Sequence, residues 1–331
     1  MGRILIVTNS DDLHADVVAE KIAAACAAPF RLDLDDYPAG YEIACTFARG
    51  RWEGSLGHVA SGDALPLAEV GAVWMRKKAA FRYPSGPLAG QEKAHADAET
   101  EHILLGLLHA LDCYWMSHPD ALRRSMWKIE QMQRAARMGF AVPASLATNR
   151  RANVEALRAA AEHGIVFKSL SSASLAAEDV PPDERVAGML PTTLVTAAHD
   201  DALDSVAELP GFFQHYVPKR HEVRATVIGD RLFAARIHSQ DDARTAVDSR
   251  DMSAEIRYEA ETLPPEVERR CLAFVHSYGL TYGALDLIVT PQGDYVFLEN
   301  NPGGQFLFVE QLVPELDMTG ALAACLIEGA R

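Results

Sequence analysis

Short apolar runs alternate with longer segments of helical spacing over the first third of the chain. The strand-like runs are Arg3–Thr8, Phe30–Leu34 and Val70–Arg76, and the helix-like segments are Asp12–Ala28 and Ala94–Leu111. Strands that alternate with helices in this way are typical of a mostly parallel sheet. We therefore expect a small α/β domain over residues 1–118.

The rest of the chain predicts a mixed α+β fold in two parts, residues 119–205 and 206–331. The first part has a helix at Asp120–Met138, a strand at Ala141–Ala147, a helix at Val154–His163 and a strand at Ile165–Ser169. The second part has strands at Phe212–Val217, Val223–Ile228 and Leu232–Ile237, then a helix at Glu266–Tyr278. We expect the three strands to form a meander with a Gly229-Asp230 turn.

A β-hairpin near the C-terminus has a strong turn signal. Two strand-like runs, Leu285–Thr290 and Tyr295–Leu298, flank a Pro-Gln-Gly-Asp sequence at residues 291–294. If Gln292-Gly293 is a two-residue loop, the pairing of the two strands is fixed along their whole length.

This pairing places Asp286 opposite Glu299, with Asn301 on the same face. Opposed like charges repel, so the arrangement needs a compensating cation. Two carboxylates and an amide oxygen are hard ligands that suit Mg²⁺ and leave open positions for phosphate oxygens and water. The alternative is a surface hairpin whose carboxylates simply face water.

Composition narrows the class of protein. The 331 residues are 49% apolar and 23% charged, as in ordinary globular domains. The formal charge of −15 argues against a general binder of nucleic acid or of anionic membranes. A polyanion such as ATP would therefore need a local cluster of lysine, arginine and metal.

The cysteines and the apolar runs favour a cytoplasmic protein with no membrane partner. The five cysteines are widely spaced and form no Cys-x-x-Cys motif, which suggests reduced thiols. The sequence starts directly with a strand-like run, without a signal-peptide pattern. No apolar run is long enough for a transmembrane helix.

Two lysines stand where they could bind phosphate. Lys128 lies inside the predicted Asp120–Met138 helix, where a lysine is most often only solvated. Lys168 ends a predicted strand at the edge of a loop, residues 169–177, that is rich in Ser and Ala. The backbone amides of this loop, including that of Ser171, could approach a phosphate.

The segment Gln214, His215, Tyr216 and Val217 could be a plain core strand. Its backbone edge, lined by aromatic residues, would equally suit an adenine ring. Glu222 lies five residues beyond Val217, which is a reasonable reach for a ribose hydroxyl.

Arg224 and Arg236 fall on adjacent strands of the expected meander, about one register apart. Two guanidinium groups so placed suit bidentate binding of a carboxylate or a phosphate. The alternative for each arginine is a surface ion pair with one of the surplus acidic residues.

Other catalytic patterns are absent from the sequence. It has no phosphate loop of the Gly-x-x-x-x-Gly-Lys-Ser/Thr type and no Gly-x-Ser-x-Gly nucleophile motif. His221-Glu222 is not followed by the second histidine of a zinc-protease helix, and the twelve histidines show no metal-ligand spacing. The first strand–helix turn, residues 8–12, lacks the glycines of a Rossmann nucleotide site.

Taken in order along the chain, these features resemble the ATP-grasp superfamily of carboxylate ligases, and within it the graspetide synthetases, which are microviridin-type peptide maturases. The order is Lys128, Lys168, the Gln214–Glu222 hinge and the metal hairpin. The most specific strings are Phe213–Lys219 with Glu222-Val223-Arg224, Ile237–Gln240, and Phe297–Gln305. In the N-terminal domain, Val73–Lys77 is similar to the Trp-x-Arg-Arg-Pro segment of the family.

The chain departs from the family pattern at three places. Asp248-Ser249-Arg250 stands where the family often has Asp-Trp-Arg, and Lys77-Lys78 stands in place of Arg-Pro. The loop after Lys168 contains no glycine over residues 169–174.

The resemblance implies a pre-ATP-grasp α/β domain followed by a two-subdomain ATP-grasp fold that binds ATP and Mg²⁺, with two ions expected. Adenine would lie on the Gln214–Val217 hinge, ribose on Glu222 and phosphates on Lys128 and Lys168. Asp286, Glu299 and Asn301 would hold the metal. Arg224 and Arg236 are the candidates for orienting a substrate carboxylate and stabilising its acyl phosphate.

The substrate implied by the resemblance is a ribosomal precursor peptide with a leader and a core. An Asp or Glu side chain would be activated, and a Ser, Thr or Lys side chain of the same peptide would close the ring. A homodimer is also a family expectation. Two alternatives remain: a ligase of the RimK or dipeptide type that acts on a small molecule or a protein terminus, and a nucleotide-binding regulatory protein without ligase activity.

Overall fold

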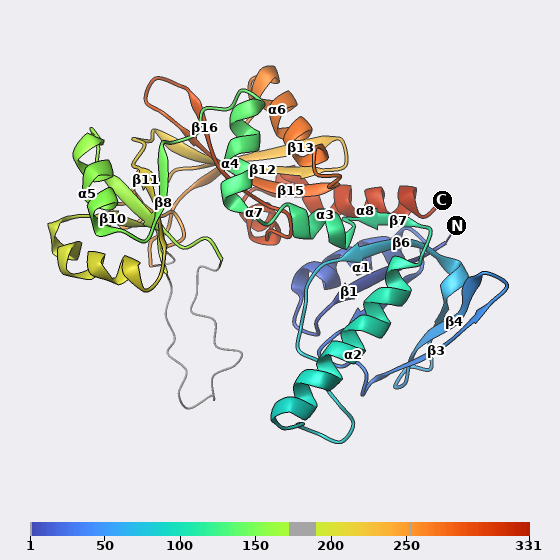
Figure 1. The fold of residues 1–331 in the computed structure, drawn as a ribbon. Helices are drawn as coiled ribbons and strands as arrows, with labels where there is room; N and C mark the ends of the chain where they lie inside the picture. The colour runs from blue at the N-terminus through green and yellow to red at the C-terminus, as the bar shows by residue number, and fades with distance from the viewer. Residues whose placement is uncertain (1, 172–189, 252) are drawn as a thin grey trace.

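The computed structural model describes residues 2–171, 190–251 and 253–331 (Figure 1). The N-terminal region is built on a four-stranded parallel sheet in the order β2-β1-β6-β7. These strands span Arg3–Thr8 (β1), Pro29–Asp33 (β2), Val70–Met75 (β6) and Tyr114–Met116 (β7), and they are joined with helices α1 (Leu13–Ala24) and α2 (Gly90–His109). The parallel α/β domain expected from the alternating pattern is therefore present.

Alternate side chains of β1 enter two different cores, as the two-residue period of a strand requires. Leu5 and Val7 pack in one cluster with α2. Ile4 and Ile6 pack in another with α1 and the C-terminal helix α8 (Met318–Gly329). The last helix of the chain thus belongs to the core of the first sheet.

Backbone pairing joins the two ends of the chain. The N–H of Gly2 donates to the carbonyl of Ala330 at 2.8 Å, and Figure 1 shows the termini side by side. A small antiparallel sheet in the order β3-β4-β5 stands beside this region. It comprises β3 (Tyr41–Ala48), β4 (Arg51–His58) and β5 (Ala64–Pro66), and the 3-10 helix η1 (Leu67–Glu69) leads from it to β6.

A second four-stranded sheet, the central sheet, is formed by strands from the middle of the chain in the order β10-β9-β11-β8, and it lies at one end of the molecule (Figure 1). Its elements are β8 (Ser145–Thr148), α5 (Arg151–Ala160), β9 (Ile165–Lys168), β10 (Thr193–Val195), the 3-10 helix η2 (Ala197–Ala207) and β11 (Gly211–His215). The predicted three-strand meander is therefore wrong in its first strand, because β11 pairs with β8 and β9. The chain crosses to the next sheet directly afterwards.

The C-terminal sheet has five antiparallel strands in the order β14-β13-β12-β15-β16. Its elements are β12 (His221–Ile228), β13 (Arg231–Ile237), β14 (Tyr258–Ala260), α6 (Pro265–His276), β15 (Tyr282–Val289) and β16 (Tyr295–Asn301). One face packs on α6 through a cluster that includes Val223, Leu285 and Phe297. The chain then continues through α7 (Leu307–Leu312) and the 3-10 helix η3 (Pro314–Leu316) to α8.

The long helix predicted at Asp120–Met138 is wrong, since two helices occupy this stretch. They are α3 (Pro119–Arg124) and α4 (Lys128–Arg137). The break lies at residues 125–127, and it places Lys128 in the first turn of α4 instead of in the middle of a helix.

Buried hydrogen bonds hold this break in place. The Ser125 hydroxyl donates to the Leu122 carbonyl at 2.9 Å, and the Gln131 side-chain amide donates to the Ser125 carbonyl at 2.6 Å. Gln131 also exchanges two hydrogen bonds with the backbone of Asn300 on β16. These bonds outweigh the helical propensity of the sequence and fix the start of α4 against the hairpin.

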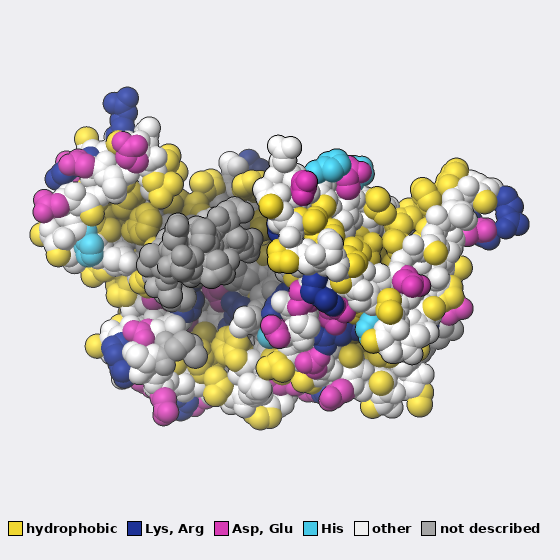
Figure 2. All heavy atoms as spheres, turned by 90° about the horizontal axis from the view of Figure 1, so that it is seen from below, with side chains coloured by type: hydrophobic (Ala, Val, Ile, Leu, Met, Phe, Trp, Pro, Cys, Tyr) yellow, Lys and Arg dark blue, Asp and Glu magenta, His cyan; other side chains and the backbone are white. Residues whose placement is uncertain are grey.

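The three groups of strands agree with the expected fold class, an α/β domain followed by two α+β parts. We retain residues 118 and 205 as a proposed division of the chain, although β11 lies beyond residue 205 and pairs in the central sheet. Among the described residues, no helix combines the length and apolar character needed to cross a bilayer. On the face shown in Figure 2, the basic side chains that are visible are scattered among acidic and apolar ones.

Candidate active site

The hairpin of β15 and β16 brings Asp286 opposite Glu299, as the sequence predicted, but through a different turn. Val289 pairs with Tyr295, so the loop has three residues, 291–293, and the predicted two-residue loop is wrong. Gly293 has a φ of 96°, a conformation that favours glycine and suits a three-residue hairpin loop.

A β-bulge at Leu298 restores the predicted pairing. The register shifts by one residue between Asp286 and Leu287, which leaves Leu298 as the extra residue of β16. If Leu298 instead paired with Asp286 in a regular ladder, Glu299 would oppose Leu285 and would point into the core cluster under α6. The bulge therefore turns Glu299 to the same face as Asp286, which is a common use of bulges beside functional sites.

Basic side chains of the chain itself compensate the two carboxylates. Arg224 donates from Nη1 to both oxygens of Asp286, at 2.7 and 2.9 Å. Lys128 Nζ lies 2.5 Å from Glu299 Oε2. The Asn301 amide donates to Asp286 at 3.0 Å and to Glu299 at 3.2 Å, so the three predicted metal ligands lie together.

Burial and charge move the pKa values of these groups in different directions. Burial raises the pKa of Asp286, and the negative charge of Glu299 raises it further. Arg224 lowers this pKa, but the net shift is upward. Burial alone would also raise the pKa of Glu299, but Lys128, Asn301 and Lys168 together hold it below its usual range. The two acids thus differ because Lys128 and Lys168 both lie on the side of Glu299.

A pocket beside Glu299 brings together several of the predicted site residues. Lys128 of α4, Lys168 of β9, Gln214 of β11 and Leu298 of β16 line it with Glu299. Burial lowers the pKa of Lys168, and the positive charges of Lys219 and Lys128 act in the same direction. Lysines from two separate elements therefore converge on one pocket between the central and C-terminal sheets.

The hinge leaves one backbone donor available. The N–H groups of His215 and Tyr216 donate within the protein, to the carbonyls of Ala144 and Gly164 at 2.8 and 2.9 Å. Within residues 2–171, 190–251 and 253–331, the N–H of Val217 has no hydrogen-bond partner. An adenine edge needs such a donor, so Val217 is the hinge residue best placed to supply one.

Glu222 is held by two partners at the start of β12. Lys219 Nζ lies 2.5 Å from Oε1, and the Ser249 hydroxyl donates to Oε2 at 3.0 Å. Ser249 is one of the positions where the sequence departs from the family pattern. Ser249, which departs from the family pattern, thus contacts Glu222, the residue predicted to bind the ribose.

The two predicted catalytic arginines lie on opposite faces of the C-terminal sheet. Arg224 pairs with Ala235 and Arg236 pairs with Val223, so the predicted one-register offset is present. Residues that pair directly share a face and adjacent residues do not. Arg236 consequently points to the α6 side, where it bonds Glu261 at 3.2 Å, and it does not join Arg224 at the carboxylate face.

The loop that follows Asn301 is held by three side chains, one for each of three consecutive carbonyls. Arg76 donates to Gly303 at 2.9 Å, Tyr282 to Gly304 at 2.8 Å and Arg224 to Gln305 at 3.1 Å. A Cβ on Gly304 would lie 2.9 Å from Arg224 Nη2, so this glycine permits the close approach. Sequence analysis missed Tyr282, for which the sequence carries no local signal.

Arg76 links this loop to the N-terminal domain. Its Nε atom lies 3.5 Å from the buried carboxylate of Asp12. Burial alone would raise the pKa of Asp12, but hydrogen bonds with His14 and Thr8 and the charges of Arg76 and Lys77 hold it well below its usual range. The Val73–Lys77 segment, noticed in the sequence only by resemblance, thus contacts the tail of the metal hairpin.

Only the start of the predicted phosphate loop can be placed. Ser169 lines the pocket with Lys168, and Ser171 is exposed at the end of a described range. Residues 172–177 of the predicted loop lie outside the described residues.

The donor set of the hairpin fits Mg²⁺. Asp286 and Glu299 present carboxylate oxygens on one face, each side chain is 26% exposed, and Asn301 joins them with a side-chain amide. Hard oxygen donors of this kind suit Mg²⁺. The nitrogen and oxygen of an asparagine amide are assigned from hydrogen-bond partners, so Asn301 can present its oxygen to a cation.

Comparisons with known proteins agree with this arrangement. Residues 3–123 match the family described as the MvdD pre-ATP grasp domain. The macrocyclase MdnC from Microcystis aeruginosa MRC, solved with its precursor peptide MdnA, has 27% identity and a TM-score of 0.85, over 98% of this chain and 99% of that chain. A RiPP-associated ATP-grasp ligase from Chryseobacterium gregarium, solved with ADP and a leader and core peptide, has 27% identity and a TM-score of 0.87, over 99% and 97%.

A third solved structure is also similar over the full length. The macrocyclase MdnB from Microcystis aeruginosa MRC has 26% identity and a TM-score of 0.76, over 99% of this chain and 100% of that chain. No curated protein sequence matches the chain. The N-terminal family match, the full-length similarity and the order of site residues agree with one another. The chain thus carries a pre-ATP-grasp domain of the MvdD type and is similar over its full length to solved ATP-grasp macrocyclases.

Proposed function

We propose that this enzyme uses ATP to activate Asp or Glu side-chain carboxylates of a ribosomal precursor peptide as acyl phosphates and then closes side-chain ester or amide rings. The observation that carries the proposal is the convergence of Lys128, Lys168 and Arg224 on the Asp286–Glu299 pair. This convergence occurs in a chain that is similar over nearly its whole length to two enzymes solved with precursor peptides.

ATP lies in the pocket between the central and C-terminal sheets in this proposal. The adenine ring occupies the hinge from Gln214 to Val217 and accepts a hydrogen bond from the free N–H of Val217. Glu222 accepts hydrogen bonds from the ribose hydroxyls. Lys128 and Lys168 bind phosphate oxygens, and the backbone near Ser171 adds amide donors.

Asp286, Glu299 and Asn301 are the residues that would hold Mg²⁺, and we propose two ions. When bound, the metal neutralises charge on the phosphates during transfer. Lys128 and Arg224, which pair with the carboxylates in the structure, also supply positive charge beside the phosphates. Positioning and charge neutralisation account for most of the catalysis in phosphoryl transfer.

The reaction proceeds in two steps. A carboxylate oxygen of the peptide attacks the γ-phosphorus, the bond to the bridging oxygen breaks and ADP leaves. A hydroxyl or amine of the same peptide then attacks the acyl carbon, phosphate leaves with the bonding electrons, and the nucleophile loses its proton. Arg224 is the residue proposed to orient the carboxylate and the oxyanion. Arg236 has no part in this proposal, because it lies on the other face of the sheet.

The precursor peptide binds through a leader and presents its core at the carboxylate face. A homodimer and a cytoplasmic location belong to the proposal as expectations from the family and the sequence. All five cysteines are free thiols in the structure, which suits a reducing compartment.

The proposal is tested by intact mass of a candidate precursor, encoded beside the gene and rich in Thr, Asp and Glu, after incubation with enzyme, ATP and Mg²⁺. We expect the loss of one water per ring, coupled to ADP formation, and neither change with the Lys168→Ala variant. ADP formation without water loss would contradict the peptide substrate and favour a small-molecule ligase. No ADP with any candidate peptide would favour the regulatory protein.

A further inference from the structure

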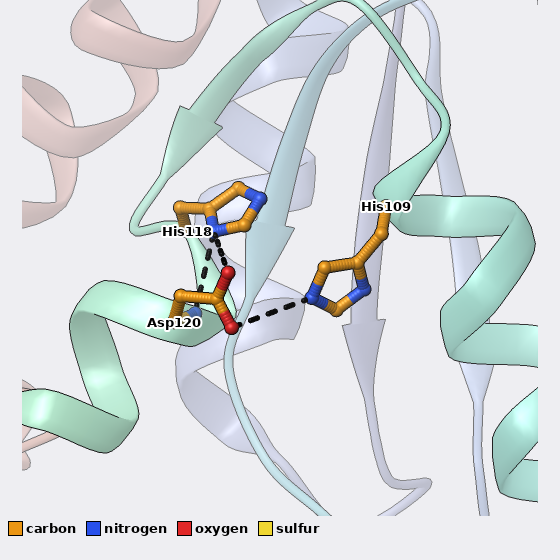
Figure 3. Close-up of side chains that lie close together, drawn as sticks. All are labelled: His109, His118 and Asp120. Carbon is orange, nitrogen blue, oxygen red and sulfur yellow. Dashed lines mark hydrogen bonds and ion pairs between the residues drawn. The ribbon is translucent and has the colours of Figure 1, made fainter.

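Two histidines and an aspartate lie together at the junction of α2 and α3, away from the ATP pocket (Figure 3). His109 Nε2 lies 3.9 Å from one carboxylate oxygen of Asp120, and His118 Nδ1 lies 3.8 Å from the other. One nitrogen or oxygen of each residue lies within 4.8 Å of the other two. The spacing of the two histidines carries no metal-ligand signal, because they come together only where the chain returns through β7 between α2 and α3.

The hydrogen bonds around the cluster indicate where the imidazole protons are. His109 Nδ1 lies 2.7 Å from the Leu105 carbonyl oxygen, which can only accept, so Nδ1 carries a proton. His118 Nδ1 accepts from the backbone N–H of Asp120 at 3.3 Å, so this nitrogen carries none. In neutral His109, the nitrogen that faces Asp120 therefore has a free lone pair.

Three electron-pair donors thus lie close together, and the lone pair of one of them, His118 Nδ1, accepts the long 3.3 Å bond from the Asp120 N–H. A cation bound among the donors would take the place of this weak bond and would offset the repulsion between the donors. Imidazole nitrogen and carboxylate oxygen are the donors that Zn²⁺ and related divalent ions prefer. The hydrogen bond from His109 to Leu105 is the kind of support that usually orients a metal-binding histidine.

Aromatic packing limits the movement of the two imidazole rings. The Trp115 ring centroid lies 5.0 Å from that of His118 and 6.2 Å from that of His109. The side chains of His109 and His118 are 32% and 36% exposed, and that of Asp120 is 62% exposed. The cluster is therefore partly fixed and still open to an ion from solvent.

We propose that His109, His118 and Asp120 bind one divalent transition-metal ion of the Zn²⁺ type, with water completing the coordination. The ligands come from the end of α2 and the start of α3. A bound ion would link the two ends of residues 110–119, the segment that joins the N-terminal sheet to the rest of the chain. Its role is structural and does not depend on the ATP site or on the proposed function.

The test is a calorimetric titration of the full-length protein with Zn²⁺, in excess Mg²⁺ so that the hard-ligand site is occupied. We expect one ion per chain for the wild type. His109→Ala and Asp120→Asn should weaken binding by at least about tenfold. His102→Ala removes an exposed histidine of the same helix and should bind as the wild type does.

A second readout separates metal binding from a local folding defect. Zn²⁺ should raise the melting temperature of the wild type and of His102→Ala, and should leave that of His109→Ala unchanged. Absence of Zn²⁺ binding to the wild type would overturn the proposal. Equal binding by all variants would also overturn it, and would point to the cysteines instead.

Discussion

The two faces of the C-terminal sheet carry the same types of residue in different arrangements. On one face, Arg224 pairs with Asp286, and Lys128 pairs with Glu299. Lys128 and Glu299 line a pocket, and a second lysine, Lys168, lines the same pocket. This face holds two opposed carboxylates and basic groups from three different elements.

The opposite face gathers its charges around one carboxylate. Glu261 is bonded by Arg236 at 3.2 Å and by the Tyr295 hydroxyl at 3.2 Å, and it lies 3.3 Å from His221. Burial and the charge of Glu261 raise the pKa of Tyr295 to about 12. Burial lowers the pKa of His221 in spite of Glu261.

The difference shows that a shift of one position along a strand moves a residue from the proposed catalytic face to the face that we assign to stability. Glu261 has a full set of partners from its own sheet, so this cluster has no further charge to offer a ligand. Asp286 and Glu299 repel each other and are held by groups that can equally bind phosphate. The carboxylate face is therefore the face that we propose binds an ATP–metal complex, and we assign the Glu261 face to the stability of the fold.

Insertion of one alanine between Leu298 and Glu299 should have the largest effect on this comparison. The added residue would shift Glu299 and Asn301 by one position along β16 and turn them toward the α6 side. Loss of these proposed metal ligands from the carboxylate face removes several kcal/mol of transition-state stabilisation, so ring formation should fall by on the order of 10³-fold or more. Leu298→Ala keeps the register and is the control. Ring formation by the insertion variant at the rate of the control would show that the register does not matter.

Glu261→Gln should affect stability and leave chemistry unchanged. The carboxylate is 7% exposed, and its loss leaves Arg236 and His221 beside a neutral group. Because Arg236 is partly exposed, we expect a cost of roughly 2 kcal/mol in the free energy of unfolding. Urea unfolding measures this cost, and turnover per folded molecule should match the wild type. A loss of turnover at unchanged stability would contradict the assignment, because it would place catalysis on the Glu261 face.

Lys168→Arg should change the pH dependence of ATP use. Burial lowers the pKa of Lys168, so this lysine loses its proton, and with it the phosphate contact, at a lower pH than an exposed lysine does. Arginine stays protonated over this range. The alkaline limb of kcat/KM for ATP reports the free enzyme and should move to higher pH in the variant. If the alkaline limb does not move in the variant, a group other than Lys168 sets it.

Ser249→Ala should give the smallest effect. Its hydroxyl donates to Glu222 at 3.0 Å, and loss of one hydrogen bond to a charged group costs about 1 kcal/mol or slightly more. The KM for ATP should therefore rise by roughly fivefold at unchanged kcat. A matched change at Ser253, which lies outside the site, should leave KM unchanged. An unchanged KM in Ser249→Ala would remove Glu222 from the ribose site.

The sequence was sufficient for strands such as β1, β12 and β13 and for the pairing of Asp286 with Glu299, but it missed the small sheet of β3, β4 and β5. It was insufficient for the hairpin turn, since a three-residue loop and a bulge give the same pairing as the predicted two-residue loop. It was also insufficient for the side of the sheet on which Arg236 lies, because a one-register offset between strands reverses the face.

Long-range contacts explain the remaining differences. Propensity alone favours one helix through Ser125, but bonds from Gln131 to Ser125 and Asn300 break it. Arg76 reaches Gly303 from a distant strand, and local sequence carries no signal for such a contact. Most of the candidate site residues could thus be proposed from the sequence, whereas the face of Arg236 and the groups that position the site required the tertiary structure.

The most direct test of the central claim compares Arg224→Met with Arg236→Met in one assay of ADP formation and peptide mass. We predict that Arg224→Met loses ring formation by about 10²-fold or more, because it removes the group that orients the carboxylate. Arg236→Met should form rings as the wild type does and lose only stability. Ring formation that survives in Arg224→Met and fails in folded Arg236→Met would contradict the assignment of the two faces.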